Sequence, residues 1–104
     1  MELADWHMWW KRSGARELRR LLMDEWDPIG VRGVPEAADE YDGYMSPIVS
    51  RLREDASAED IAAFLTEVEE ERMGLRASAA ARSRNEALAE GLRSWYADAT
   101  AERG

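Results

Sequence analysis

Apolar side chains recur every three or four residues in four separate stretches of this sequence. The clearest series consists of Ile61, Phe64, Leu65 and Val68. The other three stretches lie within residues 3–22, 41–52 and 88–96. This spacing places apolar side chains on one face of an α-helix, and no window shows the strict alternation that is typical of a β-strand. The pattern predicts an all-α protein, a compact antiparallel bundle of about four helices joined by short loops.

Length and composition indicate one small domain that covers residues 1–104. Within it we expect a tryptophan-rich helical segment at 1–14 and a frayed C-terminus at 97–104. The absence of cysteine excludes disulfides and thiolate metal sites, and it fits a reducing cytosol. Because the sequence has neither a run of about 18 apolar residues nor a signal-peptide pattern, we expect a cytoplasmic protein without membrane attachment.

Proline and glycine residues mark the ends of the first two helical stretches. The Ser-Gly pair at 13–14 either divides the first stretch or marks the close approach of another backbone. The Asp-Pro pair at 27–28 ends it, because the residue before a proline avoids the α region. A proline suits the first turn of a helix, so we expect the second helix over 35–52, with a bend at the Ser-Pro pair at 46–47. The alternative is a new helix there, with Ser46 as its cap.

The last two helices have clearer boundaries. Ser57 followed by Asp60 resembles a capping box, and Gly74 follows the end of that apolar series. The final helix is expected to begin near Ser78 and to fray after Ala99. These residues predict two short loops and two well-defined helices.

The carboxylates are unevenly distributed along the chain. Fourteen of the 22 Asp and Glu residues lie between Glu25 and Glu71, where the only cations are Arg32, Arg51 and Arg53. Because like charges repel unless a complementary charge meets them, this acidic block predicts a surface for a basic protein partner. The formal net charge of −8 disfavours nucleic-acid binding, which depends on contacts between cations and phosphates. The Glu-rich run at 67–71 is interpreted as a solvated helix face.

The segment that follows the first helical stretch predicts a rigid corner between two helices. Trp26 can anchor it to the core, and the Asp27 carboxylate can accept backbone N–H groups of the turn. Gly30 can supply a backbone angle that other residues resist. If the corner also binds a partner, its tyrosines act as anchors among carboxylates that steer the encounter. The predicted partner-binding residues are Asp27, Asp39, Glu40, Tyr41, Asp42 and Tyr44.

This corner also carries a family resemblance. The sequence W-D-P-I-G-V at 26–31, with D-E-Y-D-G-Y at 39–44, resembles a signature of short, mostly uncharacterised bacterial helical proteins. The resemblance covers residues 17–75. Some small acidic proteins of this kind are suspected of being immunity proteins that neutralise a toxin, so the resemblance implies a helical inhibitor. The aromatic cluster at 6–10 lies outside it.

The N-terminal aromatic cluster has two interpretations. Trp6, Trp9 and Trp10 share one helix face with Leu3, whereas Met8 points away. They either pack in the core or form an exposed apolar face that docks on a partner, because large apolar patches seldom remain in water. Membrane attachment through nearby cations is the third interpretation, which the net charge opposes.

No motif for catalysis or for metal binding is evident. The carboxylates at 36, 39 and 40, and those at 67, 70 and 71, could share a helix face, but His7 is the only histidine and lacks a Glu three residues before it. The Asp-rich segment lacks the spacing of calcium ligands. No nucleophile elbow and no phosphate-binding glycine pattern occurs. We therefore expect no catalytic residue, no metal and no cofactor.

Together these features predict a binding protein. The first hypothesis is an intracellular immunity protein or inhibitor that covers a basic toxin domain, with a nuclease as one candidate because its phosphate-binding site is positively charged. The alternative is a regulatory or structural subunit of a larger bacterial complex that docks through its tryptophan-rich first helix. An enzyme is the third hypothesis. The sequence leaves the partner's identity and the oligomeric state open.

Overall fold

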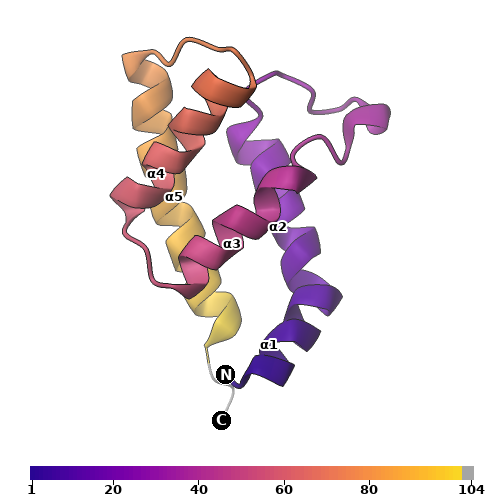
Figure 1. Ribbon diagram of the computed structural model, residues 1–104. Coiled ribbons are helices and arrows are strands. Elements are labelled where there is room, and N and C mark those ends of the chain that lie inside the picture. Colours follow the sequence, from indigo (N-terminus) through magenta and orange to yellow (C-terminus); the bar gives the residue numbers. More distant parts are fainter. Residues whose placement is uncertain (102–104) are drawn as a thin grey trace.

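Four helical segments run alternately up and down in the computed structural model, which describes residues 1–101 (Figure 1). The first helical segment rises from the N-terminus, α3 (Met45–Arg53) descends across it, α4 (Ala58–Glu67) rises and α5 (Ala79–Thr100) descends. No strand occurs among the described residues. The prediction of an all-α fold with four helical stretches is confirmed.

The first helical segment is continuous from residue 3 to residue 26. It consists of α1 (Leu3–Trp9), the π-turn η1 (Trp10–Gly14), α2 (Ala15–Leu21) and the π-turn η2 (Leu22–Trp26). The residue pair at 13–14 does not divide it, because Gly14 keeps helical angles. A Cβ atom at Gly14 would lie 2.9 Å from ring atoms of both Trp9 and Trp10. The close approach at this glycine is therefore made by two indole rings and not by another backbone.

The predicted helix over 35–52 is wrong in its first half. Residues 35–44 contain only two single 3-10 turns, η3 (Pro35–Ala37) and η4 (Asp42–Tyr44), and α3 begins after them. Pro47 lies in the first turn of α3, where a backbone N–H has no acceptor within the helix, so it causes no break. The residue before the helix is Tyr44 and not Ser46.

The predicted boundaries of the last two helices are confirmed at three positions. The Ser57 hydroxyl accepts the Asp60 N–H at 3.1 Å and caps α4, which continues through the π-turn η5 (Val68–Arg72). Gly74 follows with φ +66°. The Ser78 hydroxyl caps α5 by accepting the N–H of the residue three positions on. Both serines satisfy donors that a helix start leaves unpaired.

The C-terminal helix is longer than the sequence suggested. It continues to Thr100, whose hydroxyl donates to the Tyr96 carbonyl at 2.7 Å. The predicted fraying over 97–104 is therefore wrong for residues 97–100, while residues 102–104 lie outside the described part.

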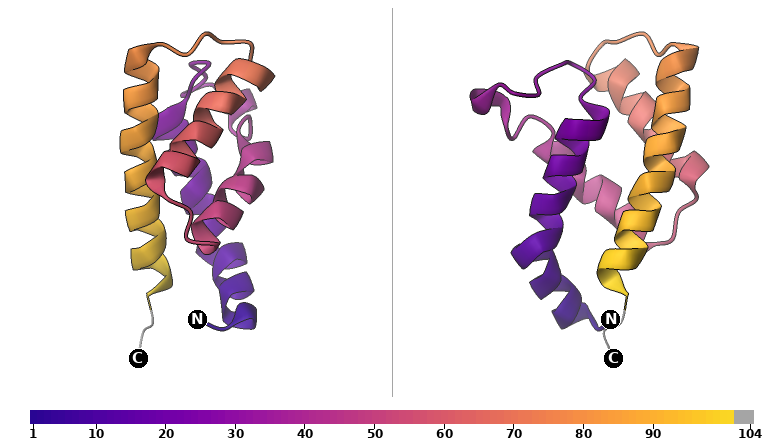
Figure 2. Two further views of the ribbon diagram at one scale, coloured as in Figure 1. Left: turned by 60° about the vertical axis from the view of Figure 1, so that its left-hand side comes forward. Right: turned by 180° about the vertical axis from the view of Figure 1, so that it is seen from behind.

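The core lies where all four segments meet, and α4 packs along α5 (Figure 2). Six large aliphatic side chains are fully buried: Leu18, Leu22, Ile48, Ile61, Leu65 and Leu92. Leu3 does not join them, because 54% of its surface is exposed. Full burial of one large aliphatic side chain contributes about 1.5–3 kcal/mol to the free energy of unfolding. This cluster is therefore the main source of stability.

Candidate functional site

The connection between the first helical segment and α3 projects beyond the bundle, and we call residues 27–44 the corner (Figures 1 and 2). It begins at Asp27, which ends η2 in the left-handed conformation with φ +36°. The Asp27 N–H donates to the Leu22 carbonyl at 2.9 Å. This bond closes the helix end as the chain turns outward.

The Asp27 carboxylate holds the corner together. Its Oδ1 atom accepts the Val31 N–H at 2.8 Å and the Tyr41 hydroxyl at 2.7 Å. Its Oδ2 atom accepts the Arg32 N–H at 3.1 Å. The prediction that this carboxylate accepts backbone groups of the turn is confirmed, and so is the positive φ of Gly30, at +67°.

Tyr41 ties the far end of the corner back to its beginning. Its ring packs on Trp26 with ring centroids 5.3 Å apart, and only 2% of its surface is exposed. The hydroxyl also accepts the Ile29 N–H at 3.3 Å. Burial and the hydrogen bond to Asp27 raise the pKa of the Tyr41 hydroxyl, so it stays a donor.

The same contacts keep Asp27 charged. Burial raises the pKa of its carboxyl, but the hydrogen bonds from Tyr41, Val31 and Arg32 and the charge of Arg32 lower it by more. The pKa of Asp27 therefore lies below its usual value. An ionised acceptor makes each of the three hydrogen bonds stronger than a neutral one would.

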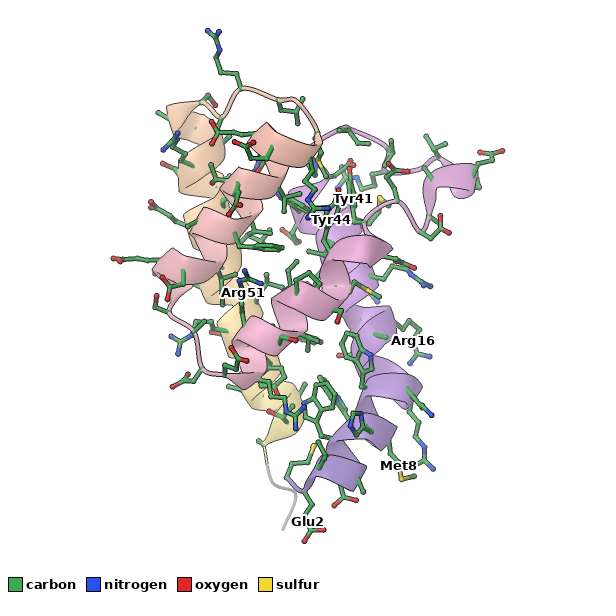
Figure 3. The ribbon with its side chains drawn as sticks, in the orientation of Figure 1. Glu2, Met8, Arg16, Tyr41, Tyr44 and Arg51 are labelled. Atoms are coloured by element: carbon green, nitrogen blue, oxygen red, sulfur yellow. The ribbon has the colours of Figure 1, made fainter. Side chains whose placement is uncertain are left out.

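The structure corrects the predicted partner-binding set. Tyr41 is buried, Asp27 is occupied by the corner's own donors, and Tyr44 is half-buried with its ring edge on Trp26. Figure 3 shows both tyrosines inside the outline of the bundle, at the base of the corner. All three side chains contribute to the packing of the corner, and Tyr41, which is buried, is not available as an exposed anchor.

The three remaining carboxylates of the set differ from one another. Asp42 pairs with the Arg19 guanidinium, whose Nε lies 2.9 Å from Asp42 Oδ1. This hydrogen bond and the Asp42 charge raise the pKa of Arg19. Asp39 and Glu40 are exposed, and within residues 1–101 they form no ion pair and no side-chain hydrogen bond. Of the predicted set, only these two present unpaired carboxylates to solvent.

Sequence reasoning did not identify two apolar side chains of the corner that are exposed. Ile29 and Val34 keep 40% and 44% of their surface exposed. They lie in a segment rich in proline and glycine, where no helical or strand periodicity indicates which side chains are buried. Their exposure in a loop that is held by hydrogen bonds gives the corner an apolar component as well as an acidic one.

The exposed carboxylates of the acidic block are spread over several elements. They occur on η2, on the corner, around the start of α4 and from the end of α4 along η5. Ten of its members are exposed and form no ion pair in the described part of the chain: Glu25, Glu36, Asp39, Glu40, Glu54, Glu59, Asp60, Glu67, Glu70 and Glu71.

The interpretation of the Glu-rich run at 67–71 as a solvated helix face is wrong for one glutamate. Glu69 is buried, with 3% of its surface exposed. Its Oε2 atom accepts the Trp26 indole N–H at 3.2 Å and the Asn85 amide at 2.5 Å. Glu69 therefore links the base of the corner to α5.

The three tryptophans of the first helix pack with aromatic rings of the same helix and of α5, and one of them is buried. Trp6 is 9% exposed and donates its indole N–H to the Tyr96 hydroxyl at 2.8 Å. Trp9 lies with its ring centroid 5.9 Å from those of Trp95 and Tyr96. Trp10 stacks on Trp6. The core-packing interpretation is thus confirmed for Trp6, whereas Trp9 and Trp10, the other two predicted docking residues, pack against the core and keep part of their surface exposed.

Within residues 1–101, no group of three or more His, Asp or Glu side chains converges to hold a metal ion. The described helices include none that is long and apolar enough to cross a membrane. Comparisons with protein-family models, curated proteins and solved structures find no match to this chain.

Proposed function

We propose that this protein inhibits a basic protein partner, as an immunity protein neutralises a toxin, and that it contacts this partner through the corner. The observation that carries the proposal is a projecting segment, fixed by its own hydrogen bonds, that exposes three carboxylates which form no ion pair in the described chain. These carboxylates are Glu36, Asp39 and Glu40.

The charge of the corner would act mainly on association. Unpaired carboxylates attract a basic surface before contact and raise the association rate by about tenfold or more at low salt. Ile29 and Val34 can then lose their exposed apolar surface at the interface. Because Asp27 and Tyr41 already hold the loop, little ordering entropy is lost on binding.

A nuclease remains the first candidate for the partner. Its substrate site must attract phosphates, so a carboxylate surface can occupy the same place. The resemblance of residues 26–31 and 39–44 to proteins suspected of immunity function supports the same proposal.

The alternative, a subunit that docks through its tryptophan-rich first helix, has less support. That helix directs Trp6 into the core and packs Trp9 against Trp95 of α5. Deletion of residues 1–12 would therefore unfold the bundle, so failure of that variant to assemble would not identify a docking surface.

The first experiment is affinity capture of the tagged protein from a lysate of its source cells, with washes at low and then high salt and mass spectrometry of the retained proteins. The test variant D39K/E40K reverses the two unpaired carboxylates of the corner. The control E67K/E70K changes the net charge by the same amount on α4 and η5, where both side chains are exposed and form no ion pair in the described chain.

We expect the wild type and E67K/E70K to retain one basic polypeptide that elutes with salt, and D39K/E40K to lose it. With the purified partner, the association rate of D39K/E40K should fall by about tenfold or more. Equal retention by D39K/E40K, or retention that resists salt, would reject the corner as the contact surface.

A further inference from the structure

A groove of about 390 Å³ lies between α2 and the corner. Its apolar lining includes Met23, Val31 and Val34. Arginines 16, 19 and 20 line it from the side of the first helix. This volume lies within the range of small-molecule pockets, which are mostly apolar and hold a few polar groups that orient the ligand.

The charge of the groove is opposite to that of the protein as a whole. Three arginines line it against one carboxylate, Asp24, whereas the chain has 22 carboxylates and 14 cations. Arg19 is already paired with Asp42, and Arg20 Nε lies 3.8 Å from Asp24 Oδ2. Arg16 is exposed and forms no ion pair with any residue of the described part. One guanidinium beside the apolar surface is therefore available to an anion.

Figure 3 shows Arg16 projecting from the outer side of the first helix. Figure 1 shows the corner extending on that same side, above it. A ligand whose anionic group pairs with Arg16 can therefore place an apolar chain in the groove, against Met23 and Val34.

We infer that this groove binds a single-chain amphiphile with an anionic head, such as a medium-chain fatty acid. The guanidinium fork of Arg16 matches a carboxylate, and the alkyl chain covers the apolar lining.

This site differs from the proposed inhibition in the charge of its ligand, although Val34 belongs to both surfaces. The unpaired carboxylates of the corner serve a basic partner, whereas the groove serves an anion. A variant that loses one binding activity can therefore still be assayed for the other.

The test uses decanoate as the probe and observes methyl signals of Met23 and Val31 by NMR. Decyltrimethylammonium, which has the same chain and a cationic head, tests the charge preference. R16E removes the cation and V34D places a charge on the apolar lining, and both positions are exposed. Matched controls are R76E, at an exposed arginine outside the groove, and I29D, at an exposed apolar residue of the corner outside the groove.

We expect saturable shifts with decanoate, affinity about tenfold weaker in R16E and V34D, and unchanged affinity in R76E and I29D. The cationic probe should cause no saturable shift. Absence of saturation with decanoate, equal binding of the cationic probe, or equal losses in the controls would each overturn the inference.

Discussion

Replacing Tyr41 with Phe removes one hydroxyl group from the centre of the corner. The ring of Tyr41 stays in place against Trp26, because Phe has nearly the same shape. What is lost is the donor to Asp27 Oδ1 at 2.7 Å, together with a weaker acceptor for the Ile29 N–H at 3.3 Å. The substitution therefore removes one hydrogen bond to a charged acceptor and one weaker bond from a backbone N–H, while it keeps the ring contact.

The expected loss of unfolding free energy in Y41F follows from the hydrogen bonds that remain at Asp27. A hydrogen bond to a charged group contributes about 1.5–3 kcal/mol. Asp27 keeps two backbone donors and part of its surface remains accessible, so we expect the lower part of this range, about 1.5–2 kcal/mol. For a domain of this size, such a loss lowers Tm by roughly 10 °C.

Urea denaturation at several pH values measures the effect and its origin. The pKa of Asp27 is lowered in the folded protein, so its stabilisation is present above the unfolded pKa of about 3.9 and is lost as the pH falls through the folded pKa. Removing the Tyr41 donor raises the folded pKa toward its usual value. The difference in unfolding free energy between wild type and Y41F should therefore be largest at neutral pH and should shrink in acid.

Tyr44→Phe is the matched control. Tyr44 also contacts the Trp26 ring, but its hydroxyl forms no hydrogen bond within the described residues. Its replacement should change the unfolding free energy by less than about 0.5 kcal/mol. If Y41F and Y44F lose equal stability, or if the loss in Y41F is independent of pH, the ionised Asp27 carboxylate does not hold the corner through Tyr41.

Two further substitutions test the core. Glu69→Ala leaves the buried Trp26 indole N–H without an acceptor and takes one of two acceptors from the Asn85 amide, so it should cost about 2–4 kcal/mol in urea denaturation, whereas the exposed neighbour Glu70→Ala should stay within about 0.5 kcal/mol. Gly14→Ala should destabilise by about 1–2 kcal/mol despite better helix propensity, because its Cβ would meet two indole rings. Gly91→Ala in α5, where a Cβ meets nothing within 4 Å, should instead stabilise by about 0.5–1 kcal/mol, and the same sign at both glycines would contradict this interpretation.

The parts of the fold that the sequence predicts well depend on contacts between near neighbours. Ser57 and Ser78 cap their helices through the backbone three residues on, and Gly74 takes its left-handed angle where an apolar series ends. The same holds for Asp27, whose carboxylate binds the turn four and five residues ahead. In each case the chemistry of the residue and its partner lies within one short window.

The parts that sequence reasoning missed depend on distant partners. Local signals after Pro35 favour a helix, yet burial of Tyr41 against Trp26 and its bond to Asp27 select a different backbone. The buried position of Glu69 follows from donors on η2 and α5. Nothing in a run of glutamates distinguishes the one that faces inward at the π-turn.

The corner is longer than a connection between two helices needs to be. Two helices of a bundle can be joined by a few residues, whereas this connection spans residues 27–44 with only two single 3-10 turns. It is held by the buried Tyr41 and by an ionised, partly accessible Asp27, yet it leaves Ile29 and Val34 exposed. Long loops without regular structure are commonly either disordered or functional. Since hydrogen bonds hold this one at its base, we propose that it serves contacts outside the bundle, with a basic partner at its carboxylates and an anionic amphiphile in the groove beneath it.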